Sequence, residues 1–167
     1  SARLAFDVSA WLETGAWTTA AATGEARERP VAEHARHALN TRARKLRKEL
    51  KGLTELDPQT RHKVRIQAKK VRYAAEFFTC LAEGKKGAKA AKRFVSRLKP
   101  LQEALGELND VANAERALRA LADRNQDAGL AFAAGEAADA IGRSESKLLH
   151  KAQRAARRFA KAEVFLD

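Results

Sequence analysis

The segment DPQTRHKVRIQAKKVRYAAEFF, residues 57–78, decides the fold. Asp57 followed by Pro58 is a typical helix start, because the carboxylate accepts hydrogen bonds from free N–H groups and proline has no N–H to leave unpaired. Apolar residues then recur at helical spacing, at Val64, Ala68, Val71, Ala75 and Phe78. The pattern predicts an amphipathic helix that begins at this pair and runs to about residue 81.

A cationic arc runs along the other side of this predicted helix. At about 100° per residue, four side chains share a narrow arc, namely His62, Arg65, Lys69 and Arg72. Like charges one turn apart destabilise a helix by about 0.2–0.5 kcal/mol per pair, so the arrangement does not serve folding. The ordinary alternative is a solvated helix face. However, the arc contains almost no Asp or Glu, which favours an anion-binding surface.

The rest of the chain also predicts helix, and the fold class is all-α. Ala, Leu, Arg, Lys and Glu dominate the composition, with three prolines and nine glycines among 167 residues. We expect a bundle of about six helices, with a linker at 20–30, a loop at 83–87 and a kink or split at Pro100. The predicted helices span 2–19, 31–51, 57–81, 88–122, 127–141 and 142–162.

Each predicted helix has candidate core residues. The first helix is expected to bury Leu4, Phe6, Val8, Trp11, Leu12 and Trp17. The apolar stripe of the second comprises Val31, Ala35, Leu39, Leu46, Leu50 and Leu53.

A net charge of +12 selects anionic partners. Candidates are DNA, RNA, anionic lipid or a free polyphosphate chain, and charge alone does not choose among them. Cys80 is the only cysteine, which suits a reducing, cytoplasmic location. No apolar run is long enough to cross a bilayer, and we predict no membrane partner. The chain begins with Ser and contains no Met, which suggests a fragment.

Two further predicted helices carry cationic rows. The second helix has His34, His37, Arg44, Lys45 and Lys48 on one face. The sixth has Lys147, His150, Lys151, Arg154, Arg157, Arg158 and Lys161. The pattern from His37 to Lys48 recurs from His150 to Lys161 at a constant offset, which suggests that these helices are equivalent members of two repeats.

Catalytic and metal-binding alternatives find less support in the sequence. His34 and His37 could ligate a metal, but no Cys or carboxylate at fixed spacing completes the shell. His62 could be a general base, but among cations it is better suited to donate a hydrogen bond to phosphate. Glu103, Glu107 and Asp110 form a row that could bind a metal, or could pair with Lys or Arg from a neighbouring helix. We predict no enzyme activity, no metal and no cofactor.

Two motifs resemble those of a known family. The pattern His62-x2-Arg65-Ile66-x2-Lys69-Lys70-x-Arg72-Tyr73-Ala74-x-Glu76-Phe77 resembles the signature helix of the CHAD family, the conserved-histidine α-helical domains. Leu101-Gln102-x2-Leu105-Gly106-x-Leu108-Asn109-Asp110 resembles the second recurrent motif of that family. The resemblance extends from about Arg36 to the C-terminus.

The resemblance implies a two-repeat architecture of four-helix bundles and non-catalytic binding of inorganic polyphosphate. Residues 1–53 would end the first repeat, and residues 54–167 would form the second. The implied polyphosphate-binding residues are His62, Arg65, Lys69 and Arg72, with His37, Arg44, Lys45, Lys48, Lys147, His150, Lys151, Arg154, Arg157, Arg158 and Lys161. The chain is about half as long as a typical member, so self-association could complete the basic channel. The alternative reading is a nucleic-acid-binding domain, although the cationic rows lack aromatic residues for stacking bases.

Overall fold

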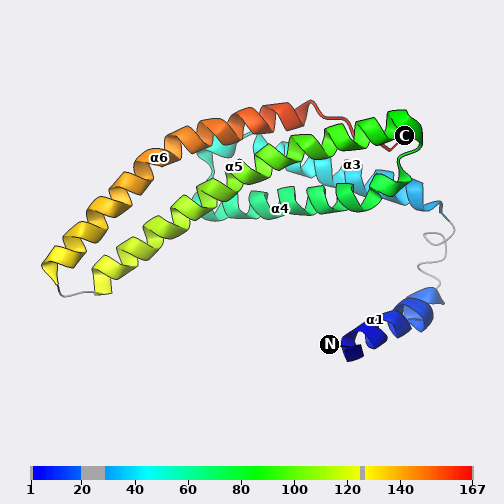
Figure 1. Ribbon diagram of the computed structural model, residues 1–167, viewed down its shortest axis with the longest axis horizontal. Helices are drawn as coiled ribbons and strands as arrows, with labels where there is room; N and C mark the ends of the chain where they lie inside the picture. Colours follow the sequence, from blue (N-terminus) through cyan, green and yellow to red (C-terminus); the bar gives the residue numbers. More distant parts are fainter. Residues whose placement is uncertain (1, 20–28, 125–126, 167) are drawn as a thin grey trace. The chain divides into compact units, whose positions relative to one another are not determined.

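The computed structural model describes residues 2–19, 29–124 and 127–166, and these are helical almost throughout (Figure 1). The α-helices are α1 (Ala2–Thr14), α3 (Val31–Leu50), α4 (Pro58–Phe77), α5 (Gly84–Arg124) and α6 (Ala128–Ala160). Short 3-10 helices are η1 (Ala16–Thr18), η3 (Leu53–Glu55) and η4 (Phe78–Leu81). The described residues contain no strand, which confirms the all-α prediction.

Helix α4 begins where the sequence predicts. The Oδ1 atom of Asp57 accepts hydrogen bonds from the N–H groups of Gln59 (2.8 Å) and Thr60 (3.0 Å). The Thr60 hydroxyl donates to Oδ2 (2.6 Å). These bonds, led by that of the Thr60 side chain, hold the pKa of the Asp57 carboxyl below its ordinary value. The predicted apolar face is buried at Val64, Ala68, Val71 and Ala75, while Phe78 is half buried in η4.

Helix α5 is longer and more continuous than the sequence predicts. It begins at Gly84, inside the segment predicted as a loop, and Gly84 has a φ of 62°, in the left-handed region that favours glycine. The helix also runs through Pro100, so the predicted split does not occur. An internal proline costs about 3 kcal/mol, whereas each buried Leu or Phe contributes about 1.5–3 kcal/mol. Burial of Phe94, Leu98 and Leu101 therefore outweighs the proline.

Helix α6 joins two segments that the sequence predicts as separate helices. It starts at the cap residue Asp127, whose Oδ1 accepts hydrogen bonds from Gly129 N (2.8 Å) and Leu130 N (3.1 Å). It then continues through Gly142 to Ala160. The predicted break at Gly142 is wrong because a helical glycine costs only about 1 kcal/mol, which the packing of α6 on α5 offsets.

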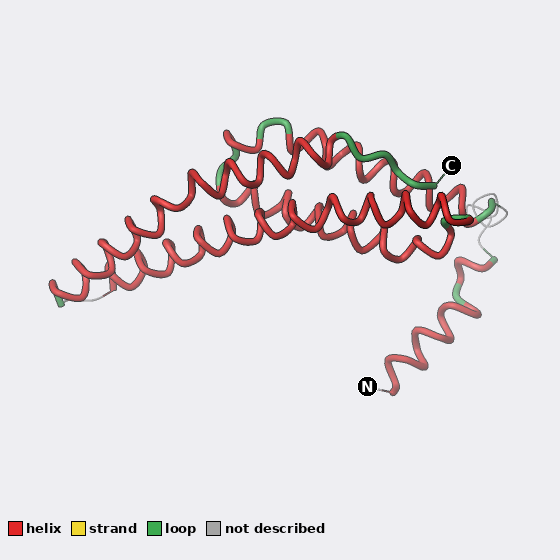
Figure 2. The backbone as a smooth tube through the Cα atoms, turned by 45° about the horizontal axis from the view of Figure 1, so that its top comes forward, coloured by secondary structure: helices red, strands yellow, loops and turns green. Residues whose placement is uncertain are grey.

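Residues 36–167 form one compact unit, and its core lies among α3, α4, α5 and α6. Helices α5 and α6 run antiparallel, and α4 lies along α5 (Figures 1 and 2). The rings of Phe159 and Phe165 meet Phe94 edge-on, at centroid distances of 5.8 and 5.9 Å. Beyond the start of α4, α5 and α6 continue as a two-helix hairpin (Figure 2).

Arg47 connects α3 to the end of α6. Its guanidinium lies over the Phe159 ring, 5.5 Å from the centroid, and donates a hydrogen bond to the carbonyl oxygen of Ala162. Burial lowers the pKa of Arg47. The predicted stripe of α3 and its C-terminal extension are buried at Ala35, Leu39, Leu46, Leu50 and Leu53, whereas Val31 is exposed.

Residues 1–35 form a second, smaller unit. In α1 the side chains of Phe6, Val8, Trp11 and Leu12 are exposed, so the prediction that they are buried is wrong. The side chains of Leu4 and Trp17, and positions 20–28 of the predicted linker, lie outside the described residues. The predicted repeat boundary at 53/54 stays a prediction.

Across the described ranges, none of the helices combines the length and the apolar character that a bilayer crossing needs.

Candidate anion-binding groove between α4 and α5

The predicted cationic arc of α4 lies beside the buried face of this helix, not opposite to it. Arg65, Lys69 and Arg72 are half buried, and His62 is exposed. The sequence predicts a core face on the far side of the helix from these cations. The difference arises because α5 packs against the edge of α4 that carries His62 and Arg65. We call the seam between these two helices, from His62 to Arg72, the groove.

Helix α5 forms the facing side of this groove through the second motif. The Oδ1 atom of Asn109 lies 2.6 Å from Nδ1 of His62. A Cβ atom built on Gly106 would lie 3.9 Å from Nε of Arg65, which is an ordinary contact distance. Both contacts follow one antiparallel register, in which each step forward along α4 is a step back along α5. The same register sets Gln102 opposite Lys69.

The residue spacing of the second motif therefore has a structural reason. Leu101, Leu105 and Leu108 are at most 2% exposed and pack in the core. Gln102, Gly106 and Asn109 follow the i, i+4, i+7 spacing and share the face toward α4. These three residues are uncharged. Within the part of the chain that the structure describes, no carboxylate forms an ion pair with the cations at positions 62, 65 and 69.

The Arg65 guanidinium is partly withdrawn from solvent. Its Nε atom is enclosed and has no hydrogen-bond partner among the described residues, and the same holds for Oε1 of Gln102. A cation that is enclosed without a counter-charge is costly. Electrostatic attraction is also stronger where water is scarce. An anion bound over the groove would therefore stabilise it.

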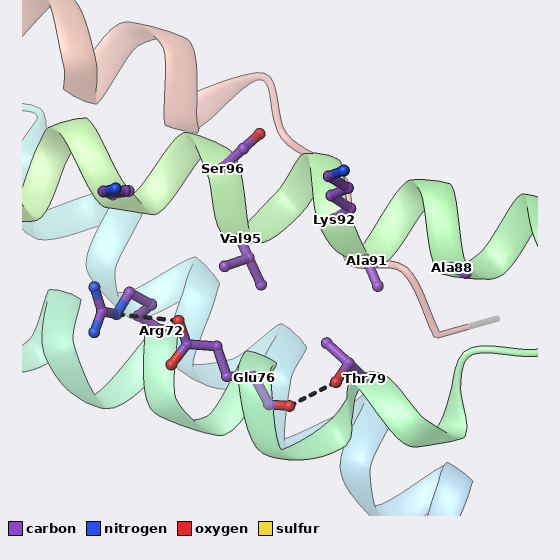
Figure 3. A pocket seen from close by; sticks show the side chains of 9 residues that line it. Arg72, Glu76, Thr79, Ala88, Ala91, Lys92, Val95 and Ser96 are labelled. Carbon is purple, nitrogen blue, oxygen red and sulfur yellow. Dashed lines mark hydrogen bonds and ion pairs between the residues drawn. The ribbon is translucent and has the colours of Figure 1, made fainter.

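Beyond Arg72 the groove opens into a cleft of about 480 Å³ between α4, η4 and α5 (Figure 3). On the α4 side, Nε of Arg72 lies 3.4 Å from Oε1 of Glu76, and its guanidinium lies 5.1 Å from the Tyr73 ring centroid. On the α5 side, the cleft is lined in part by Lys92 and Lys99. The cleft thus adds cations from a second helix to the row on α4.

Sequence reasoning missed these two lysines, although a signal was present. Residues 84–102 contain seven Lys or Arg and no Asp or Glu. This composition alone marks the first half of α5 as a basic segment. Only the register with α4 shows that Lys92 and Lys99 share a cleft with Arg72.

The cationic residues of α6 face solvent. All seven are exposed, namely Lys147, His150, Lys151, Arg154, Arg157, Arg158 and Lys161. Lys151 is compensated, because its Nζ donates hydrogen bonds to both carboxylate oxygens of Glu107 on α5 (2.6 and 2.8 Å). For Glu107, this confirms the alternative in which the carboxylate row of α5 pairs with a neighbouring helix.

The cationic residues of α3 are also exposed. They lie on the face away from the buried Leu39, Ala43 and Leu46. This set comprises His37, Arg44, Lys45 and Lys48, together with His34 at the start of the helix. Nζ of Lys45 lies 4.0 Å from Oε1 of Glu49 on the same helix. In the described part of the chain, no hydrogen bond or ion pair joins this set to α4 or α5.

Arg61, one residue before His62, does not belong to the cationic row of α4. It is 8% exposed and forms an ion pair with Glu145 of α6. This part-buried ion pair links α4 to α6. As for metals, the described residues contain no group of three or more His, Cys, Asp or Glu side chains arranged to hold an ion.

The fold and the groove define a basic all-α domain with a cationic signature helix. The family model of the CHAD domain matches residues 2–119, which include both motifs. The chain therefore belongs to the CHAD family. CHAD domains relate in general to polyphosphate binding and are of a non-catalytic type.

The match begins and ends earlier than the motifs suggest, so α6 lies outside it. Comparison with curated proteins and with solved structures gave no match.

Proposed function

We propose that the chain binds inorganic polyphosphate along the groove between α4 and α5, without catalysing its turnover. One observation carries the proposal, namely the place of the cationic row at the α5 side of α4. Arg65, Lys69 and Arg72 are half buried there, and His62 and Arg65 contact the uncharged Asn109 and Gly106 of α5. Each hydrogen bond to a charged group contributes about 1.5–3 kcal/mol. A chain of phosphates can meet several cations at once, whereas a single phosphate meets one or two.

The residues have different roles in this proposal. Arg65, Lys69 and Arg72 bind phosphate oxygens directly, and His62 does so in an orientation that Asn109 sets. Lys92 and Lys99 extend the site along α5. The exposed rows of α3 and α6 attract the polyanion and raise its association rate, since long-range steering requires charge but no preformed geometry.

Titration calorimetry with orthophosphate, tripolyphosphate and long-chain polyphosphate tests the proposal. We expect affinity to rise steeply with chain length and to fall linearly on a double-logarithmic plot against salt, because each contact releases counterions. Equal affinity for orthophosphate and for the long chain would refute the proposal.

Three further measurements separate the other readings. Duplex DNA should compete only weakly with long-chain polyphosphate, and strong competition would favour the nucleic-acid reading. Release of phosphate from polyphosphate in the presence of Mg²⁺ would contradict the absence of catalysis. The self-association predicted from the sequence stays a prediction, and sedimentation with and without polyphosphate would test it.

A further inference from the structure

The cleft beyond Arg72 differs in chemistry from the rest of the groove. We propose that it binds the organic end of a nucleoside polyphosphate, with the base in the cleft and the phosphates along α4 toward His62. This inference rests on the proposed function, because it assigns the phosphates to the same cations. It adds a ligand class that inorganic polyphosphate does not represent.

The apolar lining of the cleft supports this ligand. Its volume of about 480 Å³ falls within the range of about 300–1,000 Å³ that is typical of small-molecule sites. Ala91 is buried and Val95 is half buried, and both point from α5 toward the gap between the helices (Figure 3). Ala88 extends the same lining. A chain of charged phosphates gains nothing from apolar surface, whereas a planar base gains by leaving water.

The polar groups of the cleft complement a nucleoside. The Glu76 carboxylate lies beside Arg72 and can accept a hydrogen bond from an exocyclic amino group. The hydroxyl group of Thr79 donates to the carbonyl oxygen of Glu76, so that it keeps acceptor capacity for a ribose hydroxyl. An adenine nucleotide presents both kinds of donor.

The positions of the cations suit a phosphate chain that starts in the cleft. A helix rises about 1.5 Å per residue, so Lys69 lies about 4.5 Å from Arg72 along α4, and Arg65 about 6 Å further. Phosphates that leave the cleft at Arg72 therefore meet Lys69 first and then Arg65. On the α5 side, Lys99 lies at the same cleft. A nucleoside triphosphate can thus engage the cleft and the near end of the row together.

The experiment compares ATP with inorganic tripolyphosphate, by calorimetry at one salt concentration without Mg²⁺. Charge alone predicts that tripolyphosphate binds more tightly, because it carries more negative charge. We expect the opposite order, with ATP binding about tenfold more tightly, because base burial adds an apolar contribution. An affinity for ATP equal to or below that for tripolyphosphate would overturn the inference.

A variant pair localises the effect. Val95→Asn keeps the charge but makes the lining polar, and should remove the preference for ATP while tripolyphosphate binding changes less than about twofold. Lys69→Gln is the matched control, since it should weaken both ligands by the same factor and leave their ratio unchanged. Thermal unfolding by circular dichroism confirms that each variant is folded. A preference for ATP that survives in folded Val95→Asn would place the base elsewhere and contradict the inference.

The two proposals fail in distinguishable ways. If neither tripolyphosphate nor long-chain polyphosphate binds, the proposed function fails and this inference fails with it. If these anions bind and ATP has no advantage over tripolyphosphate, only the inference about the cleft fails.

Discussion

The cationic rows of α4 and α6 look alike in sequence but differ in the structure. Each combines Lys and Arg with one His on one face, and each has apolar residues elsewhere on the helix. In the row of α4, three of the four residues are half buried, His62 and Arg65 contact uncharged residues of α5, and Arg72 is paired with Glu76 of its own helix. The row of α6 is exposed, and its Lys151 is bound by Glu107. The comparison teaches that the neighbouring helix decides whether a cationic row is enclosed or open to solvent.

Exposure to solvent determines how strongly the cations of α4 and of α6 interact with other charges. Interactions between exposed charges are screened within about 8 Å at physiological ionic strength. In the proposed function, the cations of α6 therefore act mainly by general attraction. In the groove, Arg65 and Arg72 each have an enclosed Nε atom, so part of each guanidinium is withdrawn from water. Contacts made there are directional and less screened.

The largest expected effect comes from removing the cations of α4 that lie in the groove. Arg65→Gln/Lys69→Gln/Arg72→Gln removes three charges from the groove, and should weaken binding of long-chain polyphosphate by about a thousandfold, or about 4 kcal/mol. The matched control, Arg154→Gln/Arg157→Gln/Arg158→Gln, removes three charges from α6 and should cost about tenfold or less. Calorimetry at one ionic strength measures both. Equal losses would show that position in a groove is irrelevant.

A second prediction separates the structural cation of α4 from the cations of the groove. Arg61→Ala removes the charged hydrogen bond to Glu145, which is about a third exposed, and should lower the free energy of unfolding by about 1.5 kcal/mol. Urea denaturation measures this loss. Under conditions where the variant is folded, its affinity for polyphosphate should equal that of the wild type. A loss of affinity in the folded variant would place Arg61 in the binding site.

A third prediction tests whether Asn109 of α5 orients the His62 side chain in the groove. Asn109→Leu removes the contact with His62, and should weaken polyphosphate binding by about tenfold, or about 1.4 kcal/mol. His62→Ala should weaken polyphosphate binding by a similar factor. The double variant should bind only slightly more weakly than either single variant, because both changes remove the same contact between His62 and Asn109. Asn113→Leu, one turn further along α5, is the control and should bind normally. Additive losses would mean that the two residues act independently.

The smallest expected effect concerns the compensated residue of α6. Glu107→Gln frees Lys151, and should tighten polyphosphate binding by about two- to threefold, since exposed ion pairs contribute about 0–1 kcal/mol. The gain should disappear in Glu107→Gln/Lys151→Gln. A gain of tenfold or more would place the row of α6 in the main site, and the contrast with α4 would then be lost.

Helix boundaries were predictable where local chemistry decides them. The cap at Asp57 and the proline at 58 mark the start of α4 correctly, and the end of α3 at Leu50 lies within one residue of the predicted end. The loop predicted at 83–87 exists but ends earlier, because α5 already begins at Gly84. The split at Pro100 and the break at Gly142 are wrong, because a proline costs only about 3 kcal/mol and a glycine about 1 kcal/mol in a helix. The free energy that α5 gains by packing against α4 and α6 exceeds that cost. This gain cannot be predicted from the residues next to the proline or the glycine.

The candidate site was predictable in its residue types but not in its assembly. The arc from His62 to Arg72 follows from helical spacing alone. The contact between His62 and Asn109, 47 positions apart in sequence, does not. Neither does the cleft that joins Arg72 to Lys92 and Lys99.

By itself, the sequence determined that the chain is helical, that its helices are amphipathic and that several faces are positive, because these properties depend on neighbours within a few residues. Only the tertiary structure decided which positive face lies in a groove and which faces water. That choice depends on the antiparallel register between α4 and α5, which is set by the burial of Leu101, Leu105 and Leu108 against residues distant in sequence.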